Sequence, residues 1–352
     1  MTDIAELQIT DIAFGGAGVA RKDGKVYFVP FTAPGDTVRA VLHKEHKRFT
    51  EARVVEILTP SPHRVEPKCV YFGRCGGCAY QHIAYPEQLA LKQRQVGETL
   101  RRVGKLGEFP MQPIVAAPLP YGYRNRIRVH VDGGQAGFFA HRSHKLIPID
   151  RCEIAQPAVN EALQELRRSA VRDGDYTLFA RDSSEFFEQI NDAVAGELLA
   201  LVERTVHRGQ ALLIDAYSGA GFFSRRLAPL FGQVIGIEEN EHAVTRARKR
   251  AAANERHLHG DVATLLAEIV GAHPMAQTSV ILDPPATGLA PRVTDLLAAA
   301  RPAEMLYVSC NPATLARDIA GLRSVYRIDS VTPLDMFPQT AEIEVLAVLR
   351  SF

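Results

Sequence analysis

The second half of the chain alternates short apolar runs with amphipathic stretches, and this alternation limits the possible folds more than any other feature. From about residue 186 onward, four runs read as strands: ALLIDAY, QVIGIEEN, SVILDPP and EMLYVSCNP. The stretches between them have helical character, as in SGAGFFSRRLAPLF and EHAVTRARKRAAANE. Short buried strands that alternate with helices predict a parallel sheet covered on both faces. We therefore expect residues 181–352 to form a Rossmann-like α/β domain.

The first part of the chain predicts a different architecture. Residues 1–58 hold short β-rich runs separated by GGAGVARKDG and TAPGD, which are turn sequences. Five short strands with glycine punctuation suit a small closed barrel of the OB kind. Three prolines between residues 60 and 67 mark a linker, and residues 59–180 read as a β-rich central domain. A helix expected at about 86–104 would be able to pack on the C-terminal domain.

The charges are divided unevenly between the two halves. Residues 1–152 carry 22 Lys and Arg against 14 Asp and Glu, whereas residues 153–352 carry 19 against 26. A basic first half suits binding of a polyanion such as RNA. No apolar run approaches the roughly 20 residues that span a bilayer, and the N-terminus lacks a secretion signal. We expect a cytoplasmic protein without a membrane partner and with no obligate protein partner evident.

Four of the five cysteines have the spacing of a metal site. Cys69, Cys75 and Cys78 read C-x5-C-G-G-C, and Cys152 follows after a β-rich insert. Structural zinc usually takes two short Cys pairs, whereas three close thiols and a distant fourth are more typical of iron–sulfur ligation. The spacing favours an iron–sulfur cluster and leaves zinc open. Nearby aromatic residues could stack on RNA bases or pack against the cluster: Tyr71, Phe72 and Tyr80.

A nucleotide-type loop follows the first apolar strand of the α/β part. The strand ends in Asp215, a tight loop with Gly219 and Gly221 follows, and the next strand ends in Glu238, where a carboxylate can bind ribose hydroxyls. This pattern also occurs in NAD-binding proteins. However, GAG is not GxGxxG, and an Asp at the end of the first strand favours S-adenosylmethionine.

Cys310 stands at the carboxyl end of another apolar strand, where open α/β sheets bind ligands. A thiolate near a methyl donor suggests one particular chemistry. Attack of the thiolate on C6 of uracil makes C5 nucleophilic enough to accept a methyl group, and a general base must then remove the C5 proton. Glu344 in FPQTAEIEVL is the candidate base.

Taken together, these motifs resemble the RNA 5-methyluridine methyltransferases that carry an N-terminal TRAM domain and a [4Fe–4S] cluster. GGAGVARKDGKVYFVPFTAPGD is similar to the TRAM barrel, and SCNPATLARD is similar to the family's nucleophile motif. The resemblance implies that Cys310 attacks the base, that Glu344 removes the proton and that the four clustered cysteines hold the iron. It also implies residues that bind the methyl donor or the target base: Gln189 in FFEQIN, Tyr217, Gly219, Glu238, Asp261 and Asp283.

The chain departs from the family pattern at three positions. Ala286 follows the DPP motif where Arg is usual, Glu342 replaces a usual His, and Phe222 replaces a usual Asn. By analogy with the family, 23S ribosomal RNA is favoured over transfer RNA as the substrate. Three alternatives stay open: an RNA cytosine-C5 methyltransferase, disfavoured because DPPAT lacks a second cysteine, a non-catalytic RNA-binding protein, and an iron–sulfur redox protein.

Overall fold

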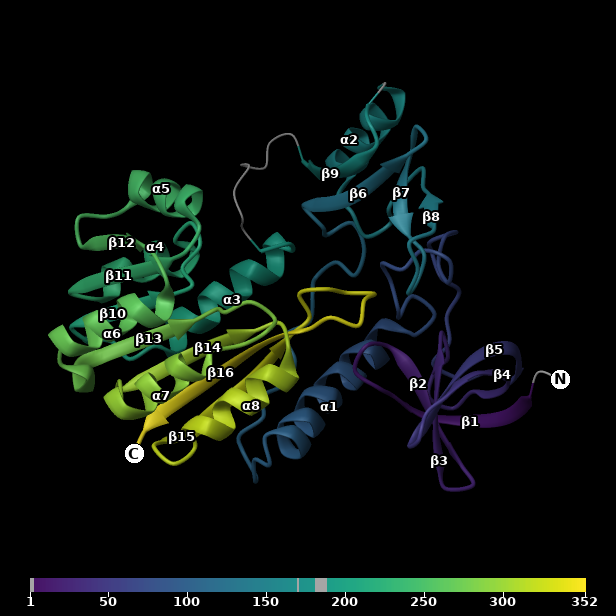
Figure 1. The fold of residues 1–352 in the computed structure, drawn as a ribbon, viewed down its shortest axis with the longest axis horizontal. Helices are drawn as coiled ribbons and strands as arrows, with labels where there is room; N and C mark the ends of the chain where they lie inside the picture. Colours follow the sequence, from purple (N-terminus) through teal and green to yellow (C-terminus); the bar gives the residue numbers. More distant parts are fainter. Residues whose placement is uncertain (1–2, 170, 181–188) are drawn as a thin grey trace. The chain divides into compact units, whose positions relative to one another are not determined.

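The computed structural model describes residues 3–169, 171–180 and 189–352, and its contacts divide the chain into two compact units. Unit 1 consists of residues 1–95, 118–183 and 337–342, and unit 2 consists of residues 96–117, 184–336 and 343–352. Figure 1 shows the elements of both units along the chain. No helix among the described residues is long and apolar enough to cross a membrane.

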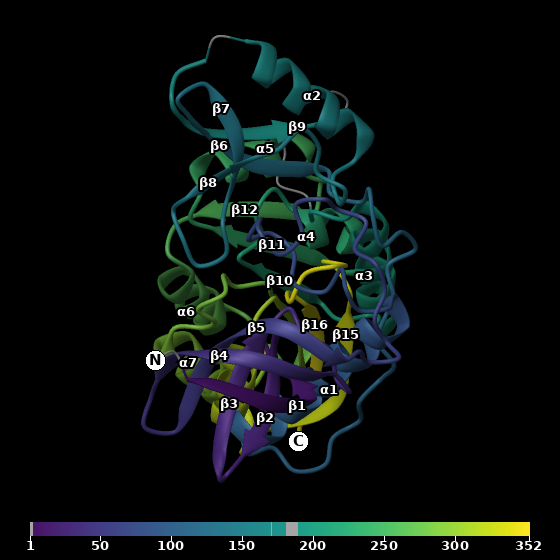
Figure 2. The ribbon, with the colours of Figure 1, turned by 90° about the vertical axis from the view of Figure 1, so that its right-hand side faces the viewer.

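Unit 1 begins with a closed five-stranded barrel, as the sequence predicts. Its strands follow the order β1-β2-β3-β5-β4 around the barrel, and only the pairing of β3 with β5 is parallel. Figure 2 shows β2 and β3 running steeply across β1, β4 and β5. Alternate strand residues point inward and are buried, among them Leu7, Ile9 and Val29. The strands are β1 (Ile4–Ile12), β2 (Ala17–Lys22), β3 (Lys25–Pro30), β4 (Thr37–Glu45) and β5 (Phe49–Thr59).

The rest of unit 1 is built on a four-stranded antiparallel sheet of order β8-β7-β6-β9. Its strands are β6 (Arg126–Asp132), β7 (Gln135–Phe139), β8 (Leu146–Pro148) and β9 (Gly174–Phe179). Helix α2 (Pro157–Arg168) covers this sheet and buries Val159 and Leu163 in its core. Helix α1 (Tyr85–Val103) begins in unit 1 and ends in unit 2.

Unit 2 contains a seven-stranded sheet of order β12-β11-β10-β13-β14-β16-β15. The first five strands are parallel. Strand β16 runs antiparallel to β14, and the edge strand β15 is antiparallel to β16, so β16 alone is reversed in this sheet. Every residue of β10 and β13 is buried, so both faces of the sheet are covered. The predicted Rossmann-like α/β fold is therefore present. The strands are β10 (Leu212–Ala216), β11 (Gln233–Glu238), β12 (Glu255–His259), β13 (Thr278–Leu282), β14 (Glu304–Ser309), β15 (Tyr326–Leu334) and β16 (Glu344–Ser351).

The helices of unit 2 cover the faces of this sheet. Helices α6, α7 and α8 and the end of α1 share one hydrophobic core with the sheet, in which Val96 and Leu100 of α1 are fully buried. Helix α1 ends where the backbone meets α8: a Cβ atom at Gly104 would lie 2.8 Å from the Ala316 carbonyl oxygen. The α-helices are α3 (Asp192–Thr205), α4 (Phe222–Leu227), α5 (Glu241–Arg250), α6 (Val262–Ala272), α7 (Pro291–Ala300) and α8 (Pro312–Leu322), with short 3-10 turns at Ala228–Leu230 and Met275–Gln277.

Candidate active site

The glycine loop of unit 2 follows the carboxyl end of β10, and its backbone has an unusual conformation. Tyr217 has a φ of 65°, in the left-handed region that bulky residues rarely adopt, and Gly221 follows with a φ of 84°. A Cβ atom at Gly221 would lie 3.3 Å from the His257 ring, so the loop approaches β12 closely. Burial raises the pKa of Tyr217 to about 12, so its hydroxyl stays protonated near neutral pH. A strained residue directly after a central strand is a common feature of ligand-binding loops.

Glu238, at the end of β11, holds this loop in place. One carboxylate oxygen accepts a hydrogen bond from the Gly219 amide at 3.0 Å, and the other accepts one from the Asn240 amide at 2.7 Å. Asp261 lies one strand farther along, after β12, and caps helix α6 by accepting a hydrogen bond from the Thr264 amide at 2.8 Å. These two carboxylates therefore follow neighbouring parallel strands at the same edge of the sheet.

Two further carboxylates lie at the carboxyl ends of the central strands β10 and β13. Asp215 is fully buried and accepts hydrogen bonds from the Ser224 amide and hydroxyl, at 2.9 and 2.5 Å. Burial raises the pKa of Asp215 to about 6. Asp283 follows β13, and burial together with the negative charge of Asp215 raises its pKa as well. The Gln189 side-chain amide donates to Asp283 at 3.5 Å, which places the two predicted donor- or base-contacting residues together. The preceding residues of FFEQIN, through Glu188, lie outside the described residues.

Cys310 and Glu344 occupy facing positions at the end of the β14–β16 pair. Ser309 of β14 lies opposite Val345 of β16 in an antiparallel ladder. The next position outward is therefore Cys310 on one chain segment and Glu344 on the other. Both residues therefore lie at the same end of these two neighbouring strands. Glu344 is buried, with 3% of its surface exposed, whereas Cys310 is half-buried.

The loop that carries Cys310 is tied to the DPP loop after β13. The Asn311 side-chain amide donates to the Ala286 carbonyl oxygen at 3.0 Å, and the Thr314 hydroxyl donates to the same oxygen at 3.2 Å. Both hydrogen bonds use the backbone of residue 286. The substitution of Ala for the family's Arg therefore leaves this connection intact.

Helix α8 adds a second, buried connection that the sequence analysis missed. Asp318 accepts hydrogen bonds from the Tyr307 hydroxyl at 2.7 Å and from the Leu289 amide at 2.8 Å, and it pairs with Arg317. Arg317 in turn donates to the carbonyl oxygens of Thr287 and Leu289. Arg317 and Asp318 are the last two residues of the SCNPATLARD segment, so this motif held the sequence signal for the connection.

The four clustered cysteines all lie in unit 1 and are half-buried. Burial, together with the neighbouring thiols, raises the pKa of Cys78 to about 12 and the pKa of Cys152 to about 11. Hydrogen-bond donors approach the sulfur atoms: the Gly77 amide lies 3.4 Å from Cys75 Sγ. Over residues 3–169, 171–180 and 189–352, no group of three or more His, Cys, Asp or Glu side chains could hold a metal ion. The described residues therefore give no support to a metal site at the four cysteines, whether zinc or iron–sulfur.

The aromatic residues around the cysteines have separate environments. Tyr80 is fully buried in the core beside the barrel, so the suggestion that it stacks on RNA is wrong. The Tyr71 hydroxyl donates to Asp150 at 2.9 Å, and the Phe72 ring packs edge-on against Phe31 with centroids 5.4 Å apart. Glu342, which replaces a usual His, is exposed and lies 3.6 Å from the Arg124 guanidinium.

Comparison with known proteins places these features in context. Residues 264–351 match the family model described as tRNA (uracil-5-)-methyltransferase, and residues 6–63 match the TRAM domain of tRNA (uracil(54)-C(5))-methyltransferase. The chain is 36% identical to the RNA methyltransferase Bd3828 of Bdellovibrio bacteriovorus, over 98% of this chain and 94% of that protein. It is 32% identical to the 23S rRNA (uracil(1939)-C(5))-methyltransferase RlmD of Alkalilimnicola ehrlichii, over 98% and 96%.

One solved structure is similar over nearly the entire chain. The tRNA (uracil-54, C5)-methyltransferase of Pyrococcus abyssi, in complex with S-adenosyl-L-homocysteine, aligns with a TM-score of 0.72 and 26% identity. The alignment covers 98% of this chain and 99% of that one. The N-terminal barrel is thus a TRAM domain, and the sheet of unit 2 has the fold of an S-adenosylmethionine-dependent methyltransferase.

Proposed function

Because the chain belongs to the family of RNA uracil-C5 methyltransferases, we propose that Cys310 and Glu344 carry out methylation at C5 of a uridine in structured RNA. The observation that supports this assignment most strongly is their facing placement beyond the Ser309–Val345 pair. A nucleophile and a base must reach adjacent carbons of one ring, and adjacent strand ends supply that spacing. S-adenosylmethionine, when bound, supplies an electrophilic methyl group.

In the proposed sequence, Cys310 acts first. Its thiolate donates a lone pair to C6 of uracil, and the C5–C6 π electrons move toward the C4 carbonyl oxygen. C5 becomes nucleophilic and forms the new bond to the methyl carbon, while the electrons of the broken carbon–sulfur bond remain on the donor's sulfur. Glu344 then removes the C5 proton, the C–H electrons re-form the double bond, and Cys310 leaves as a thiolate.

We propose that the loops after β10, β11, β12 and β13 bind the methyl donor. Parallel sheets bind ligands outside the carboxyl ends of their strands, and five of the candidate residues end or follow these strands in the sequence. The sixth, Gln189, donates to Asp283. Glu238 and Asp261 carry carboxylates suited to ribose and amine groups, and Tyr217 supplies an aromatic face. The candidate set is Gln189, Tyr217, Gly219, Glu238, Asp261 and Asp283. The target uridine would leave its stack to enter the same edge.

We also propose that Cys69, Cys75, Cys78 and Cys152 hold a [4Fe–4S] cluster. The spacing of the four cysteines and the amide directed at Cys75 support the proposal. The four cysteine sulfurs would lie farther apart around a cubane cluster than around a single zinc ion, because each zinc–sulfur bond is only about 2.3 Å long. The cluster would connect the loop at 69–78 to Cys152 and have a structural role. RNA would be bound by surfaces within residues 1–58 and 59–180, while residues 181–352 perform the chemistry.

The proposed substrate is 23S ribosomal RNA. The similarity to RlmD of Alkalilimnicola ehrlichii, which extends over 96% of that protein, supports this choice. The Pyrococcus abyssi enzyme, which acts on transfer RNA, makes tRNA the alternative.

Methyl transfer from labelled S-adenosylmethionine to the two RNA pools tests the proposal. The protein, purified without oxygen, is incubated with transcribed 23S rRNA domains and with transcribed tRNA, alongside Cys310→Ala. We expect 5-methyluridine in one rRNA fragment and none with the variant. Label in cytosine, or binding of RNA without transfer to either pool, would contradict the proposed activity. Label in tRNA alone would overturn the choice of substrate and leave the chemistry in place.

A further inference from the structure

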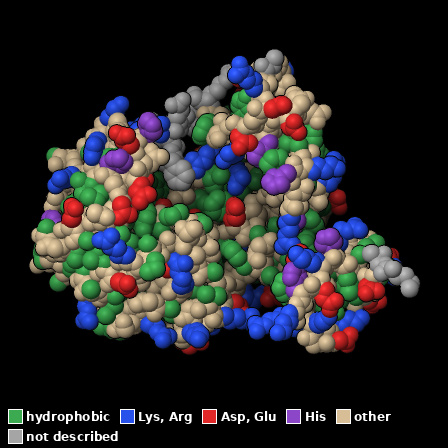
Figure 3. Space-filling view, in the orientation of Figure 1, with side chains coloured by type: hydrophobic (Ala, Val, Ile, Leu, Met, Phe, Trp, Pro, Cys, Tyr) green, Lys and Arg blue, Asp and Glu red, His purple; other side chains and the backbone are tan. Residues whose placement is uncertain are grey.

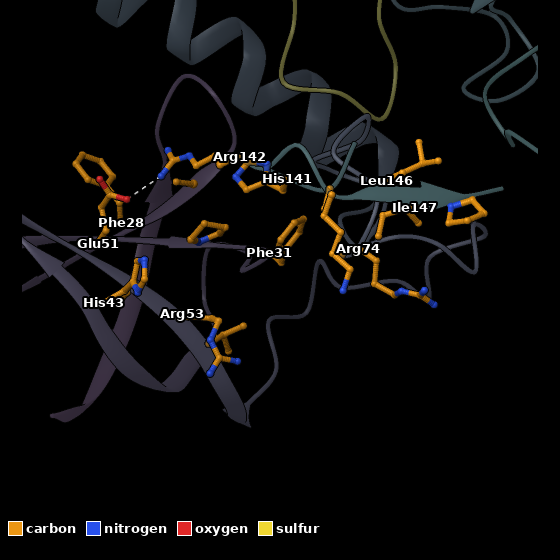
Figure 4. A pocket seen from close by; sticks show the side chains of 18 residues that line it. Phe28, Phe31, His43, Glu51, Arg53, Arg74, His141, Arg142, Leu146 and Ile147 are labelled. Carbon is orange, nitrogen blue, oxygen red and sulfur yellow. Dashed lines mark hydrogen bonds and ion pairs between the residues drawn. The ribbon is translucent and has the colours of Figure 1, made fainter. Parts of the chain in front are cut away.

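A cavity of about 740 Å³ lies in unit 1, whereas the residues proposed for catalysis belong to unit 2. The barrel strands β3, β4 and β5 form one wall, and residues 73–74 and 140–148 form the other (Figure 4). Its volume falls within the range of about 300–1,000 Å³ that holds small organic ligands. The cavity is therefore large enough for one nucleotide.

An aromatic side chain held in a strained conformation lies in the middle of this cavity. Phe31 has a φ of 63°, which a bulky residue adopts only where its surroundings enforce it. The Arg64 guanidinium fixes that backbone by donating to the Phe31 carbonyl oxygen at 3.0 Å while it pairs with buried Asp36 at 2.8 Å. Figure 4 shows the Phe31 ring beside His141, and the two ring centroids are 5.7 Å apart. The fold thus maintains a ring pair that faces the cavity.

The charges around the cavity are mainly positive. Its cationic side chains are Arg53, Arg74, Arg142 and Lys145, and all four are exposed. The single carboxylate in the lining, Glu51, is already paired with Arg142 at 2.9 Å. Figure 3 shows Lys, Arg and His side chains gathered between the barrel and the strands β7 and β8. An aromatic interior with a cationic rim suits a base and its phosphates.

Arg74 also connects the cavity to the cysteine loop. It stands directly before Cys75, whose backbone forms a β-bridge with Ala140, and the Gly76 amide donates to the Phe139 carbonyl oxygen at 2.9 Å. The two segments that form the wall opposite the barrel, residues 73–74 and 140–148, are therefore fixed to each other.

We infer that this cavity binds one unstacked nucleotide of the substrate RNA, at a position other than the methylated uridine. The base stacks on one ring of the Phe31–His141 pair, whose planes are inclined at 69°, and meets the edge of the other ring. The neighbouring phosphates contact Arg74. This inference rests on the proposed function, since it takes RNA as the substrate. It adds a second recognition point on the strand, which would select the sequence or shape around the target.

Binding of a fluorescein-labelled, twelve-nucleotide oligouridylate to the full chain tests the inference. His141→Ala is compared with His144→Ala, a histidine of the same loop outside the cavity lining, and Arg74→Gln is compared with Arg21→Gln on β2. We expect the cavity variants to bind about tenfold more weakly, because loss of one stacked base or phosphate contact has an effect of this size. The control variants should stay within about twofold of the wild type. Arg74→Gln should also reduce the salt dependence of binding by about 0.7 in the logarithmic slope.

The outcomes separate this inference from the proposed function. Equal affinity of His141→Ala and His144→Ala would overturn the nucleotide site, even if the wild type methylates RNA. If the cavity variants bind RNA more weakly but the wild type transfers no methyl group, the nucleotide site stands and the proposed activity is rejected. If both hold, the cavity variants should raise the KM for RNA while kcat at saturating RNA stays unchanged.

Discussion

Cys310 directly follows Ser309 and Glu344 directly precedes Val345, and Ser309–Val345 is the last pair of the antiparallel β14–β16 ladder. The strand that carries the nucleophile runs parallel to its other neighbour, β13, whose end carries Asp283. The end of the β14–β16 pair thus adds a thiol and a carboxylate to the edge of the sheet that we propose binds the methyl donor.

Glu344→Gln should stop the reaction after the attack of Cys310. The C5 proton has no acceptor, so we expect a covalent RNA adduct to accumulate with ordinary, unfluorinated RNA, and turnover to fall by about 10²–10⁴-fold. Denaturing gel electrophoresis detects the adduct. Glu342→Gln is the matched control, because that residue is exposed two positions earlier and should retain activity. Normal turnover by Glu344→Gln would remove this residue from the proposed chemistry.

Asp318→Ala should destabilise unit 2 by about 3 kcal/mol, because it leaves the buried Tyr307 hydroxyl and the Leu289 amide without an acceptor. Urea unfolding measures the loss of stability. Asp295→Ala, on the exposed side of α7, should change stability by less than about 0.5 kcal/mol. If the two variants unfold alike, the buried network does not stabilise the loop around Cys310.

Glu238→Gln should raise the KM for S-adenosylmethionine by about tenfold or more, because the carboxylate both fixes the Gly219 amide and accepts from ribose hydroxyls in our proposal. Glu239→Gln changes the exposed neighbour by the same chemical step and should leave the KM unchanged. Steady-state kinetics with saturating RNA compare the two. An equal effect of both substitutions would indicate a general loss of charge instead of a specific contact.

His82 should make unit 1 sensitive to acid. Burial lowers its pKa to about 4, whereas the unfolded chain has the ordinary value of about 6.5. As pH falls below 6.5, the unfolded chain binds a proton that the folded chain does not, so stability present above 6.5 is lost between 6.5 and 4, by up to about 3 kcal/mol. Thermal unfolding from pH 7.5 to 4.5 measures this loss. His82→Phe should reduce the slope over that window, and an unchanged slope would assign the acid sensitivity to other groups.

Cys152→Ser should abolish the iron–sulfur cluster while Cys310→Ser keeps it. The wild type, purified without oxygen, should contain about four iron and four sulfide per chain and absorb near 400 nm. Loss of one of four thiolate ligands prevents assembly or leaves a labile cluster. Iron and sulfide analysis gives the stoichiometry. One zinc per chain, or no metal at all, would contradict the cluster.

Much of the architecture could be predicted from the sequence because its signals are local. Glycine turns between β-rich runs indicated the barrel, and apolar runs such as ALLIDAY and SVILDPP are strands β10 and β13 in the structure. The expected helix at 86–104 is observed at Tyr85–Val103. The short strand β12 and the helix α2 were not anticipated, because ERHLH has little β-branched character and PAVNEALQELRR lies in a region read as β-rich.

The candidate site was less accessible to sequence reasoning, because its geometry depends on long-range pairing. The alternation of strands and helices predicts a parallel sheet, yet nothing in FPQTAEIEVL states that β16 inserts antiparallel beside β14. That pairing is what brings Glu344 opposite Cys310. The burial of Tyr80 and the network around Asp318 likewise arise from contacts between distant segments. The motif SCNPATLARD contains Arg317 and Asp318, but it does not show which residues they contact.

The central claim is that Cys310 forms the covalent bond to the base. Its most direct test uses 5-fluorouridine-substituted 23S rRNA fragments with labelled S-adenosylmethionine. Fluorine at C5 cannot leave as a proton does, so a methylated protein–RNA adduct should be trapped. We predict that mass spectrometry places the nucleotide on the peptide that contains Cys310, and that Cys310→Ala gives no adduct while it still binds the RNA. An adduct on another residue, or trapping by Cys310→Ala, would contradict the account.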